Sequence, residues 1–267
     1  MKTNYITLIL AFFFSFLHAQ SQITRDTIIH VPSLGKIMIS PDHTWTSYRF
    51  NDSNDSLIFN KMSCDSMLLS KYVRNRGEGN QELSGARNLR TVLKGIVYRG
   101  GGNNKYNAFC ARDNNNPLPL DGVLGLGSMG FSDIIYLYKR NFANYYPAEK
   151  LNALNEAGIH YQSIVPEDDT LAHEILSLVY DRIQSPQKGP IYLHCWNGWH
   201  MSGMIAAYTL MQFCDFNHAD ALKYWSLGAD GNDKGYLKVK QRIAAFKKYP
   251  ELEISLTDKL RVCPCIK

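Results

Sequence analysis

Residues 191–203 read Ile-Tyr-Leu-His-Cys-Trp-Asn-Gly-Trp-His-Met-Ser-Gly, an apolar run that ends in a cysteine and is followed by a short loop and a segment of helical character. The apolar run predicts a buried strand that ends at His194 and presents Cys195 at the carboxyl edge of a sheet. Backbone N–H groups of the loop can then form an anion-binding nest at the start of the next helix. The stretch therefore predicts a thiol beside an anion site.

The chain around this stretch has the alternation of an α/β domain. Short apolar runs that predict strands occupy residues 96–99, 134–138, 160–165 and 191–194. Helical patterns occupy residues 147–158, 171–183, 204–213, 218–225 and 235–249. This order predicts a three-layer domain with a short, mainly parallel sheet and helices on both faces, in which ligands bind at the carboxyl ends of the strands. Cys195 lies at such an end.

The loop resembles the signature of the cysteine-dependent protein tyrosine and dual-specificity phosphatases, which is His-Cys, five residues, Arg, Ser or Thr, and Gly. The positions in register are His194, Cys195, Gly198, Ser202 and Gly203. Met201 occupies the arginine position. The loop thus matches this family at every fixed position except one.

Flanking segments resemble the bacterial and atypical dual-specificity group of the same family, in the same order along the chain. These are Asn-Leu-Arg at 88–90, Gly-Ile-Val-Tyr-Arg-Gly-Gly at 95–101, Gly-Phe-Ser-Asp-Ile-Ile-Tyr-Leu at 130–137 and Val-Pro-Glu-Asp-Asp at 165–169. The similarity covers roughly residues 85–250. It implies the dual-specificity phosphatase fold for the main domain.

The resemblance also implies roles for individual residues. Cys195 would be the nucleophile, since a helix amino terminus favours the reactive thiolate form. His194 would anchor the loop, and Ser202 would steady the sulfur while a phosphocysteine intermediate breaks down. The family's spacing from Pro166 selects Asp169 as the general acid. The phosphate would be held by the backbone N–H groups of the loop, which are those of Trp196, Asn197, Gly198, Trp199, His200 and Met201.

Local chemistry offers other interpretations for several of these residues. Asp168 or Glu167 can be solvated or cap the helix that begins near Leu171, and Asp169 with Thr170 is itself a good helix start. Trp196 and Trp199 either wall the pocket or pack the loop against neighbouring helices.

Met201 bears directly on function, because methionine cannot grip phosphoryl oxygens as the planar fork of arginine does. An arginine on a transferred phosphoryl group can be worth about 10³–10⁵ in rate. Candidate compensating cations are His200, Arg99 and Lys105. The leading function is a phosphomonoesterase that acts through Cys195. The alternative is a pseudophosphatase that binds a phosphorylated or anionic ligand without turnover. A third hypothesis is a binding domain whose pocket no longer binds phosphate.

The amino terminus and the composition indicate the compartment and the partners of the protein. A basic start at Lys2 and a short apolar core predict a signal peptide over residues 1–19, and an uncleaved anchor is the alternative. We expect a periplasmic or secreted protein with no stable membrane insertion after cleavage. The net charge of the 267 residues is +5, and because the basic residues are scattered we expect no nucleic-acid partner. The mechanism requires no cofactor, and the sequence shows no metal-ligand spacing.

Residues 20–84 predict a small amino-terminal extension, partly β and partly irregular, before a phosphatase-like domain over residues 85–267. A hairpin is expected from Trp45 to Phe50 across residues 51–55 into residues 57–59, and a glycine-containing linker near residues 74–80. The extension carries no candidate site residue.

Six cysteines in an exported chain predict disulfides. Cys195 must stay reduced to act as a nucleophile, and Cys214 lies within an apolar helix, where it is expected to be a buried free thiol. The other four are expected to form two bridges whose pairing the sequence leaves open. They are Cys64, Cys110, Cys263 and Cys265.

Overall fold

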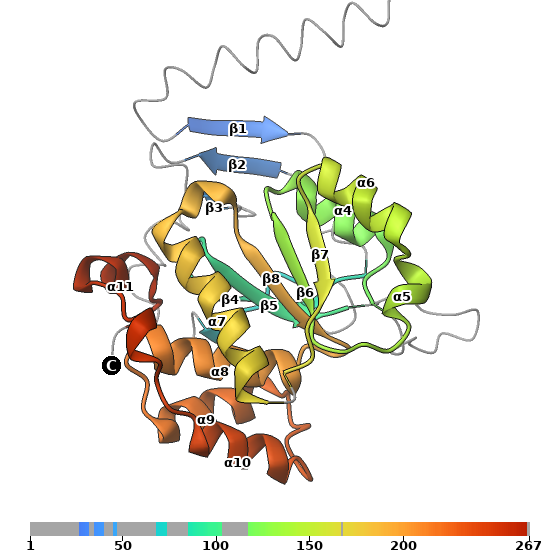
Figure 1. Cartoon of the computed structure of the whole chain (residues 1–267). Helices are drawn as coiled ribbons and strands as arrows, with labels where there is room; N and C mark the ends of the chain where they lie inside the picture. The colour runs from blue at the N-terminus through green and yellow to red at the C-terminus, as the bar shows by residue number, and fades with distance from the viewer. Residues whose placement is uncertain are drawn as a thin grey trace, which may run out of the picture. The chain divides into compact units, whose positions relative to one another are not determined.

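The computed structural model describes residues 27–31, 35–39, 45–46, 68–73, 85–102, 117–166 and 168–265 (Figure 1). The chain forms two compact units, residues 1–52 and residues 53–267. The predicted signal peptide at 1–19 lies outside the described residues. Among the described residues, no helix is both long and apolar enough to cross a membrane.

The first unit contains a three-stranded antiparallel sheet in the order β1-β2-β3. Its strands are β1 (Thr27–Val31), β2 (Gly35–Ile39) and β3 (Trp45–Thr46). A strand does begin at Trp45 as predicted, but it pairs with β2, where Ile39 is opposite Trp45. The rest of the expected hairpin lies outside the described residues.

The second unit is built on a five-stranded sheet in the order β4-β5-β8-β6-β7. The strands are β4 (Arg87–Leu93), β5 (Val97–Gly101), β6 (Asp133–Tyr136), β7 (His160–Ser163) and β8 (Ile191–Cys195). β4 pairs antiparallel with β5, and the remaining neighbours are parallel. The predicted mainly parallel sheet is confirmed, with β8 at its centre and Cys195 at the carboxyl end of β8.

Period-two alternation along the strands builds a hydrophobic core on each face of this sheet. In β6, Ile134 belongs to one core and Ile135 to the other, and all four residues of the strand are buried. In β8, Leu193 packs into the same core as Ile135, whereas Tyr192 packs with Ile134. Both faces of the central strands therefore need a covering layer of helices.

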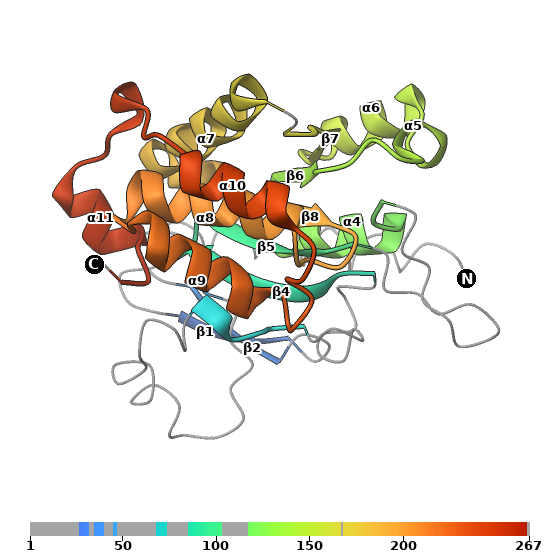
Figure 2. The ribbon, with the colours of Figure 1, turned by 90° about the horizontal axis from the view of Figure 1, so that it is seen from below.

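Helices supply both layers (Figures 1 and 2). α4 (Leu120–Ser128) and α6 (Ala148–Glu156) contribute buried side chains to one core, beside the short α5 (Phe142–Tyr145). The other core is covered by five helices. These are α7 (Asp169–Gln184), α8 (Met201–Phe213), α9 (His218–Gly228), α10 (Leu237–Ala245) and α11 (Leu256–Val262). Together with 3₁₀ turns at Pro186–Lys188 and Pro250–Leu252, they complete the predicted three-layer α/β architecture.

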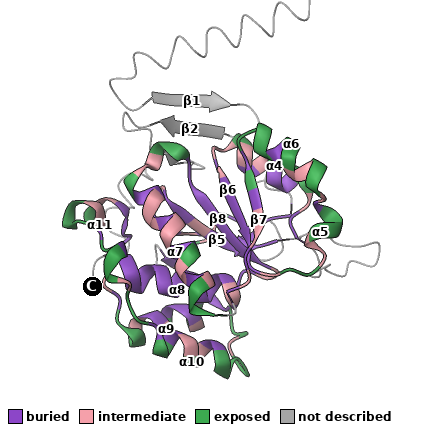
Figure 3. Cartoon of the chain, viewed as in Figure 1, coloured by how far each residue is buried: buried purple, intermediate pink, exposed green. Residues whose placement is uncertain are grey.

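The central helix is α8, which was predicted from Met204 to Phe213 and begins one turn earlier at Met201. Every residue from Ser202 to Phe213 is buried (Figure 3), as an apolar pattern on all sides of a helix indicates. α8 contacts β4, β5 and β8. It follows the Cys195 loop directly, so the helix amino terminus faces the carboxyl edge of the sheet.

Residues 68–73 precede the expected domain start at residue 85 and nevertheless pack with the second unit. Leu68 and Val73 are buried, each in one of the two cores. Val73 forms an isolated bridge with Leu89, and the N–H of Tyr72 donates to the Leu89 carbonyl at 2.9 Å. The second unit thus includes a short segment that the sequence analysis assigned to the extension.

Two expectations about the cysteines are wrong: Cys214 is not a free thiol, and Cys263 does not pair within the expected set of four. Cys214 forms a disulfide with Cys263, with the two Cα atoms 5.6 Å apart. Cys214 is buried as predicted, but it follows the last residue of α8, and there it meets Cys263, which follows the last residue of α11. That separation is within the range that a disulfide spans. Cys265 is also disulfide-bonded, Cys195 is free, and Cys64 and Cys110 lie outside the described residues.

Candidate active site

Cys195 is the last residue of β8, and only 3% of it is exposed. Its Sγ lies 3.4 Å from the Oγ of Ser202, which is in the first turn of α8. The strand fixes the cysteine and the helix fixes the serine. The short loop between them therefore brings together the two side chains that the sequence analysis selected for sulfur chemistry.

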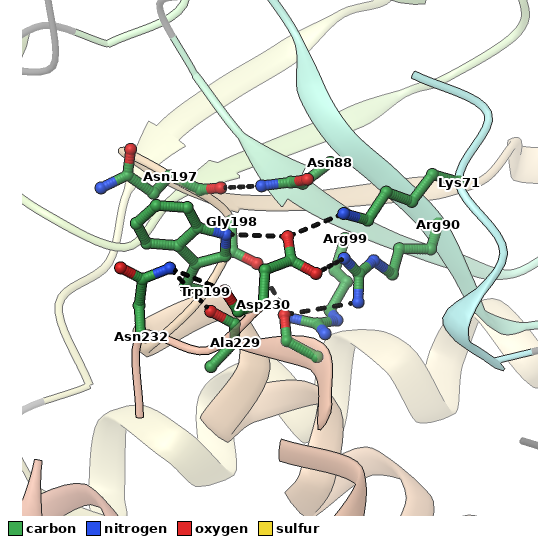
Figure 4. Close-up of polar contacts among 11 residues, drawn as sticks. Lys71, Asn88, Arg90, Arg99, Asn197, Gly198, Trp199, Ala229, Asp230 and Asn232 are labelled. Atoms are coloured by element: carbon green, nitrogen blue, oxygen red, sulfur yellow. Dashed lines mark hydrogen bonds and ion pairs between the residues drawn. The ribbon is translucent and has the colours of Figure 1, made fainter. Parts of the chain in front are cut away.

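Side chains from β4 and β5 hold the loop from its outer side (Figure 4). Each donates to a different carbonyl oxygen of the loop: Arg87 Nε to Trp196 at 2.9 Å, Asn88 Nδ2 to Asn197 at 2.6 Å, and Arg99 Nη1 to Gly198 at 2.9 Å. Three consecutive peptide groups are thus turned with their oxygens toward the sheet.

The orientation of these carbonyls also fixes the N–H groups that follow them. In a trans peptide the N–H points away from the C=O, and the chain has no cis peptide among its described residues. The N–H groups after these carbonyls therefore face the side away from β4 and β5. From Gly198 to Gly203, no backbone N–H donates to another group in the part of the chain that the structure describes. The loop thus presents a row of free donors, as an oxyanion cradle requires.

Gly198 has the backbone conformation that this loop needs. Its φ is +75°, and a Cβ there would lie 2.5 Å from the carbonyl carbon of Gly100 in β5. A side chain at 198 would be strained and would push the loop off the sheet. Steric contact with β5 therefore explains why position 198 of the loop is a glycine.

His194 is fully buried, and its ring stacks against the rings of Tyr136 and Tyr192. Burial lowers the pKa of His194 to about 3, so the ring is neutral. The hydroxyl of Tyr161 accepts from the Leu118 N–H and lies 2.9 Å from His194 Nε2. The hydroxyl proton is therefore free to go to Nε2, which leaves the Nδ1–H to donate to the Cys195 carbonyl at 3.3 Å. These contacts suit an anchor and not a proton carrier.

Trp196 and Trp199 lie on opposite sides of the loop and make different contacts. Trp196 Nε1 donates to the Tyr136 hydroxyl at 2.6 Å, and its ring lies 4.7 Å from that of Tyr138. Trp199 is 9% exposed and its Nε1 donates to Asp230 Oδ2 at 3.1 Å. Trp199 therefore packs the loop against the turn after α9, whereas Trp196 joins the aromatic side chains that follow β6.

The side chain of His200 contacts the turn between α9 and α10. Its Nε2 is 2.7 Å from the Asn232 carbonyl, and its ring stacks on that of Tyr236 at 3.4 Å between centroids. Burial lowers the pKa of His200, although the Asn232 carbonyl and Asp233 oppose that shift. The side chain is held against the turn between α9 and α10, so its geometry gives no support for a phosphate contact.

The position of the signature arginine is half-buried. Met201 is the first residue of α8 and packs against the core beneath α7 to α11. Arg99 is near but on the other side, because it donates to Gly198 from behind the loop. The third candidate, Lys105, lies outside the described residues.

The acidic segment at the start of α7 has two described carboxylates, those of Asp168 and Asp169. Asp168 caps the helix, with its Oδ1 accepting from the Leu171 N–H at 2.9 Å, which confirms the capping interpretation. Asp169 is the first residue of α7, and its carbonyl accepts from the Tyr249 hydroxyl. Neither carboxylate hydrogen-bonds to the Cys195 loop, and Glu167 lies outside the described residues. The general-acid role of Asp169 stays a prediction.

Five further residues shape the site, and the sequence pattern gave none of them a role. Arg87 and Asn88 hold loop carbonyls, whereas Asp230 pairs with Lys71 at 2.7 Å and with Arg90 at 3.3 Å while it accepts from Trp199. One sequence signal could have indicated these roles. The mostly polar residues 87–90 occupy a position along the chain at which an α/β domain needs a strand. No group of three or more His, Cys, Asp or Glu side chains among the described residues is arranged to hold a metal ion.

No protein-family model and no curated protein matches the chain. Several solved structures similar to it are phosphatases. The core catalytic domain of the PP-IP phosphatase SIW14 from S. cerevisiae, in complex with citrate, is 19% identical over 60% of this chain and 86% of that one, with a TM-score of 0.43. TpbA from P. aeruginosa is 17% identical over 60% and 85%, with a TM-score of 0.41.

A kinase associated phosphatase, crystallised with serine in place of its catalytic cysteine, is 15% identical over 55% of this chain and 83% of that one, with a TM-score of 0.42. Because these likenesses are all below a TM-score of 0.5, the function proposed next rests on the geometry of the Cys195 loop.

Proposed function

We propose that the protein is an exported, cysteine-dependent phosphomonoesterase whose nucleophile is Cys195. One observation carries the proposal. A buried thiol stands 3.4 Å from a serine hydroxyl at a helix amino terminus, beneath a loop whose carbonyls are held outward and whose N–H groups are free. Such a loop binds a tetrahedral oxyanion and places its central atom in line with the sulfur.

The reaction would proceed in two displacements. The thiolate of Cys195 attacks phosphorus, the P–O bond to the ester oxygen breaks, and the departing oxygen takes a proton from a carboxylic acid, for which Asp169 remains the candidate. Water then attacks the phosphocysteine and gives a proton to the carboxylate left by the first step, the S–P bond breaks, and inorganic phosphate leaves while sulfur returns as thiolate. The Ser202 hydroxyl, 3.4 Å from Sγ, would donate a hydrogen bond to the departing thiolate.

The second candidate is a pseudophosphatase, and two observations favour it. The position of the signature arginine carries Met201, which packs against the core, and no hydrogen bond joins the Asp169 carboxylate to the loop among the described residues. A protein of this kind would bind the phosphorylated or anionic ligand in the same cradle and fail to cleave it.

Export is supported by the apolar segment at residues 1–19 and by the Cys214–Cys263 disulfide, since structural disulfides persist in oxidising compartments. We therefore place the protein in the periplasm or outside the cell, without stable insertion in the membrane. Inositol phosphates, sugar phosphates and nucleotides are then at least as suitable substrates as phosphotyrosine, because phosphoproteins are less obvious targets there.

The decisive experiment measures hydrolysis of an aryl phosphate by the mature protein, with and without reductant, beside Cys195→Ser. Hydrolysis that needs Cys195 supports the enzyme. Stabilisation of the fold by phosphate or vanadate without hydrolysis supports the pseudophosphatase. If neither hydrolysis nor stabilisation occurs in protein shown to be folded and reduced, both candidates are wrong, and the site is not a phosphate site.

A further inference from the structure

Arg99 is a fully buried arginine that has no carboxylate partner. Its side chain is 0% exposed, and it makes no ion pair with any residue that the structure describes. Nη1 donates to the Gly198 carbonyl, whereas Nε and Nη2 have no hydrogen-bond acceptor. The guanidinium carbon lies 5.1 Å from the centroid of the Tyr224 ring. A buried charge without a counter-charge is costly, so its retention calls for an anion nearby.

The backbone around Arg99 is built to admit the guanidinium. A Cβ on Gly228 would collide with Nη2, and a Cβ on Gly203 would lie 3.0 Å from Nη1. Gly203 is in the first turn of α8, and Gly198 is in the loop itself. The guanidinium is therefore wedged between the Cys195 loop, the start of α8 and the end of α9, directly behind the row of free N–H groups.

A second buried arginine makes the region still more positive. Arg90 lies on β4, is 1% exposed and donates to the Gly228 carbonyl at 3.3 Å (Figure 4). Burial and the charge of Arg99 lower the pKa of Arg90 to about 10. Asp230 offsets Arg90 but also pairs with Lys71, so it leaves the charge of Arg99 unmatched.

We propose that Arg99 is a positioning residue. It acts from behind the loop, through the Gly198 peptide, and supplies the positive charge that an arginine at position 201 would have given to the cradle. Donation to the Gly198 carbonyl strengthens the dipole of the peptide whose N–H belongs to Trp199. The ligand class is a tetrahedral oxyanion, held by backbone donors and by charge at a distance. The anion in the cradle is the counter-charge that Arg99 lacks among the described residues.

This inference rests on the proposed oxyanion site and explains how that site works without the signature arginine. From the sequence, Arg99 is a candidate for the cation that compensates for Met201. In the structure, Gly198 stands between Arg99 and the cradle, so the charge acts without contact.

The test compares Arg99→Gln and Arg99→Lys with Arg182→Gln. Arg182 is the matched control, since it is 3% exposed, and pairs with Asp133 at 2.7 Å near the opposite ends of the strands. Inorganic phosphate and vanadate binding are measured by calorimetry, and urea unfolding is measured for every variant. We expect Arg99→Gln to weaken oxyanion binding at least about tenfold, Arg99→Lys to retain most of it, and Arg182→Gln to lose stability without losing affinity.

A second readout follows the thiol. The rate at which iodoacetamide alkylates Cys195 at pH 6 should fall in Arg99→Gln and recover in Arg99→Lys, because a positive charge behind the loop favours the thiolate. If Arg99 had only a structural role, its substitution would lower stability, but Cys195 would be alkylated at the same rate in Arg99→Gln and in Arg99→Lys.

The outcomes separate this inference from the proposed activity. If folded Arg99→Gln binds vanadate as tightly as the wild type, or if Arg182→Gln weakens binding equally, the charge role of Arg99 is wrong whatever the activity. If Arg99→Gln loses vanadate binding while the wild type hydrolyses no phosphomonoester, the inference stands and the enzyme proposal fails. Absence of oxyanion binding in the wild type overturns both.

Discussion

The indole Nε1–H of Trp199 donates to Oδ2 of Asp230 at 3.1 Å, which joins the Cys195 loop to the turn that follows α9. The same carboxylate pairs with Lys71 and Arg90, so a single side chain connects the loop, β4 and the segment before the main sheet. Burial alone would raise the pKa of Asp230, but the hydrogen bond from Lys71 and the charge of Arg90 hold it below its usual value. Asp230 is therefore ionised at neutral pH, where it fixes the loop from the side opposite to Trp196.

Asp230→Asn should loosen this junction. Asn tolerates the positive φ of 52° at this position, so the backbone is preserved while the charge is lost. Arg90 is then buried without a counter-charge, and we expect a loss of about 1–3 kcal/mol in the free energy of unfolding. Urea unfolding measures it.

The control for this change is Asp215→Asn. Asp215 pairs with Lys248 and Lys259 at the surface, where such pairs are worth about 0–1 kcal/mol. Equal losses in the two variants would show that Asp230 is an ordinary surface charge.

The parallel strands and the thiol could be predicted from the sequence because their signals are local. β6 and β8 are short, mostly apolar and fully buried, and the loop after β8 matches a fixed spacing. The alternation within β6 that separates Ile134 from Ile135 is likewise contained in adjacent residues.

What escaped prediction depends on partners distant in the sequence. β4 carries Arg87, Asn88 and Arg90, whose polarity hides a buried strand, and their use becomes visible only when residues 196–198 and 228–230 are brought against it. Cys214 was expected to be a free thiol because its disulfide partner is 49 residues away. Tertiary contacts thus override the local pattern where side chains serve the loop.

His194 should make the protein sensitive to mild acid. The unfolded chain binds a proton on this ring below about pH 6.5, whereas burial lowers the pKa in the folded protein to about 3. The stability that this histidine contributes is therefore present above pH 6.5 and is lost as the pH falls toward 3. Between pH 7.5 and 4.5 the loss should be about 2–3 kcal/mol, measured as the change in urea-unfolding free energy.

His194→Gln isolates this effect, because glutamine does not titrate. The variant should start less stable, since the contacts with Tyr161 and the Cys195 carbonyl are altered, but it should lose less stability over the same pH interval. Equal losses in the two proteins would mean that His194 takes up a proton in the folded state.

The Cys214–Cys263 disulfide should contribute strongly to stability, because its removal frees a loop of 49 residues in the unfolded chain. Chain entropy for a loop of this length corresponds to about 4 kcal/mol as an upper figure, and we expect a loss of about 2–4 kcal/mol in Cys214→Ser/Cys263→Ser. Thermal unfolding and mass mapping of alkylated peptides test both the cost and the pairing. Recovery of Cys214 as a free thiol from native protein would contradict the bridge.

Met201→Arg is the substitution that tests how this loop works without its arginine. Met201 begins α8 beside the free N–H groups, and it is half-buried against the core, so an arginine there must turn out of that packing to reach an anion. We expect folded Met201→Arg to raise aryl-phosphate turnover by about tenfold or more, below the full worth of an evolved arginine because the surroundings fit a thioether. The gain should vanish in Met201→Arg/Cys195→Ser, which ties it to the thiolate.

If Met201→Arg instead lowers a substantial wild-type rate, the buried charge of Arg99 already serves the cradle and a second guanidinium competes with it. In that case Arg99→Gln should be the more damaging change. If neither the wild type nor Met201→Arg turns over any phosphomonoester while both bind vanadate, the cradle is a binding site and the pseudophosphatase is the correct function.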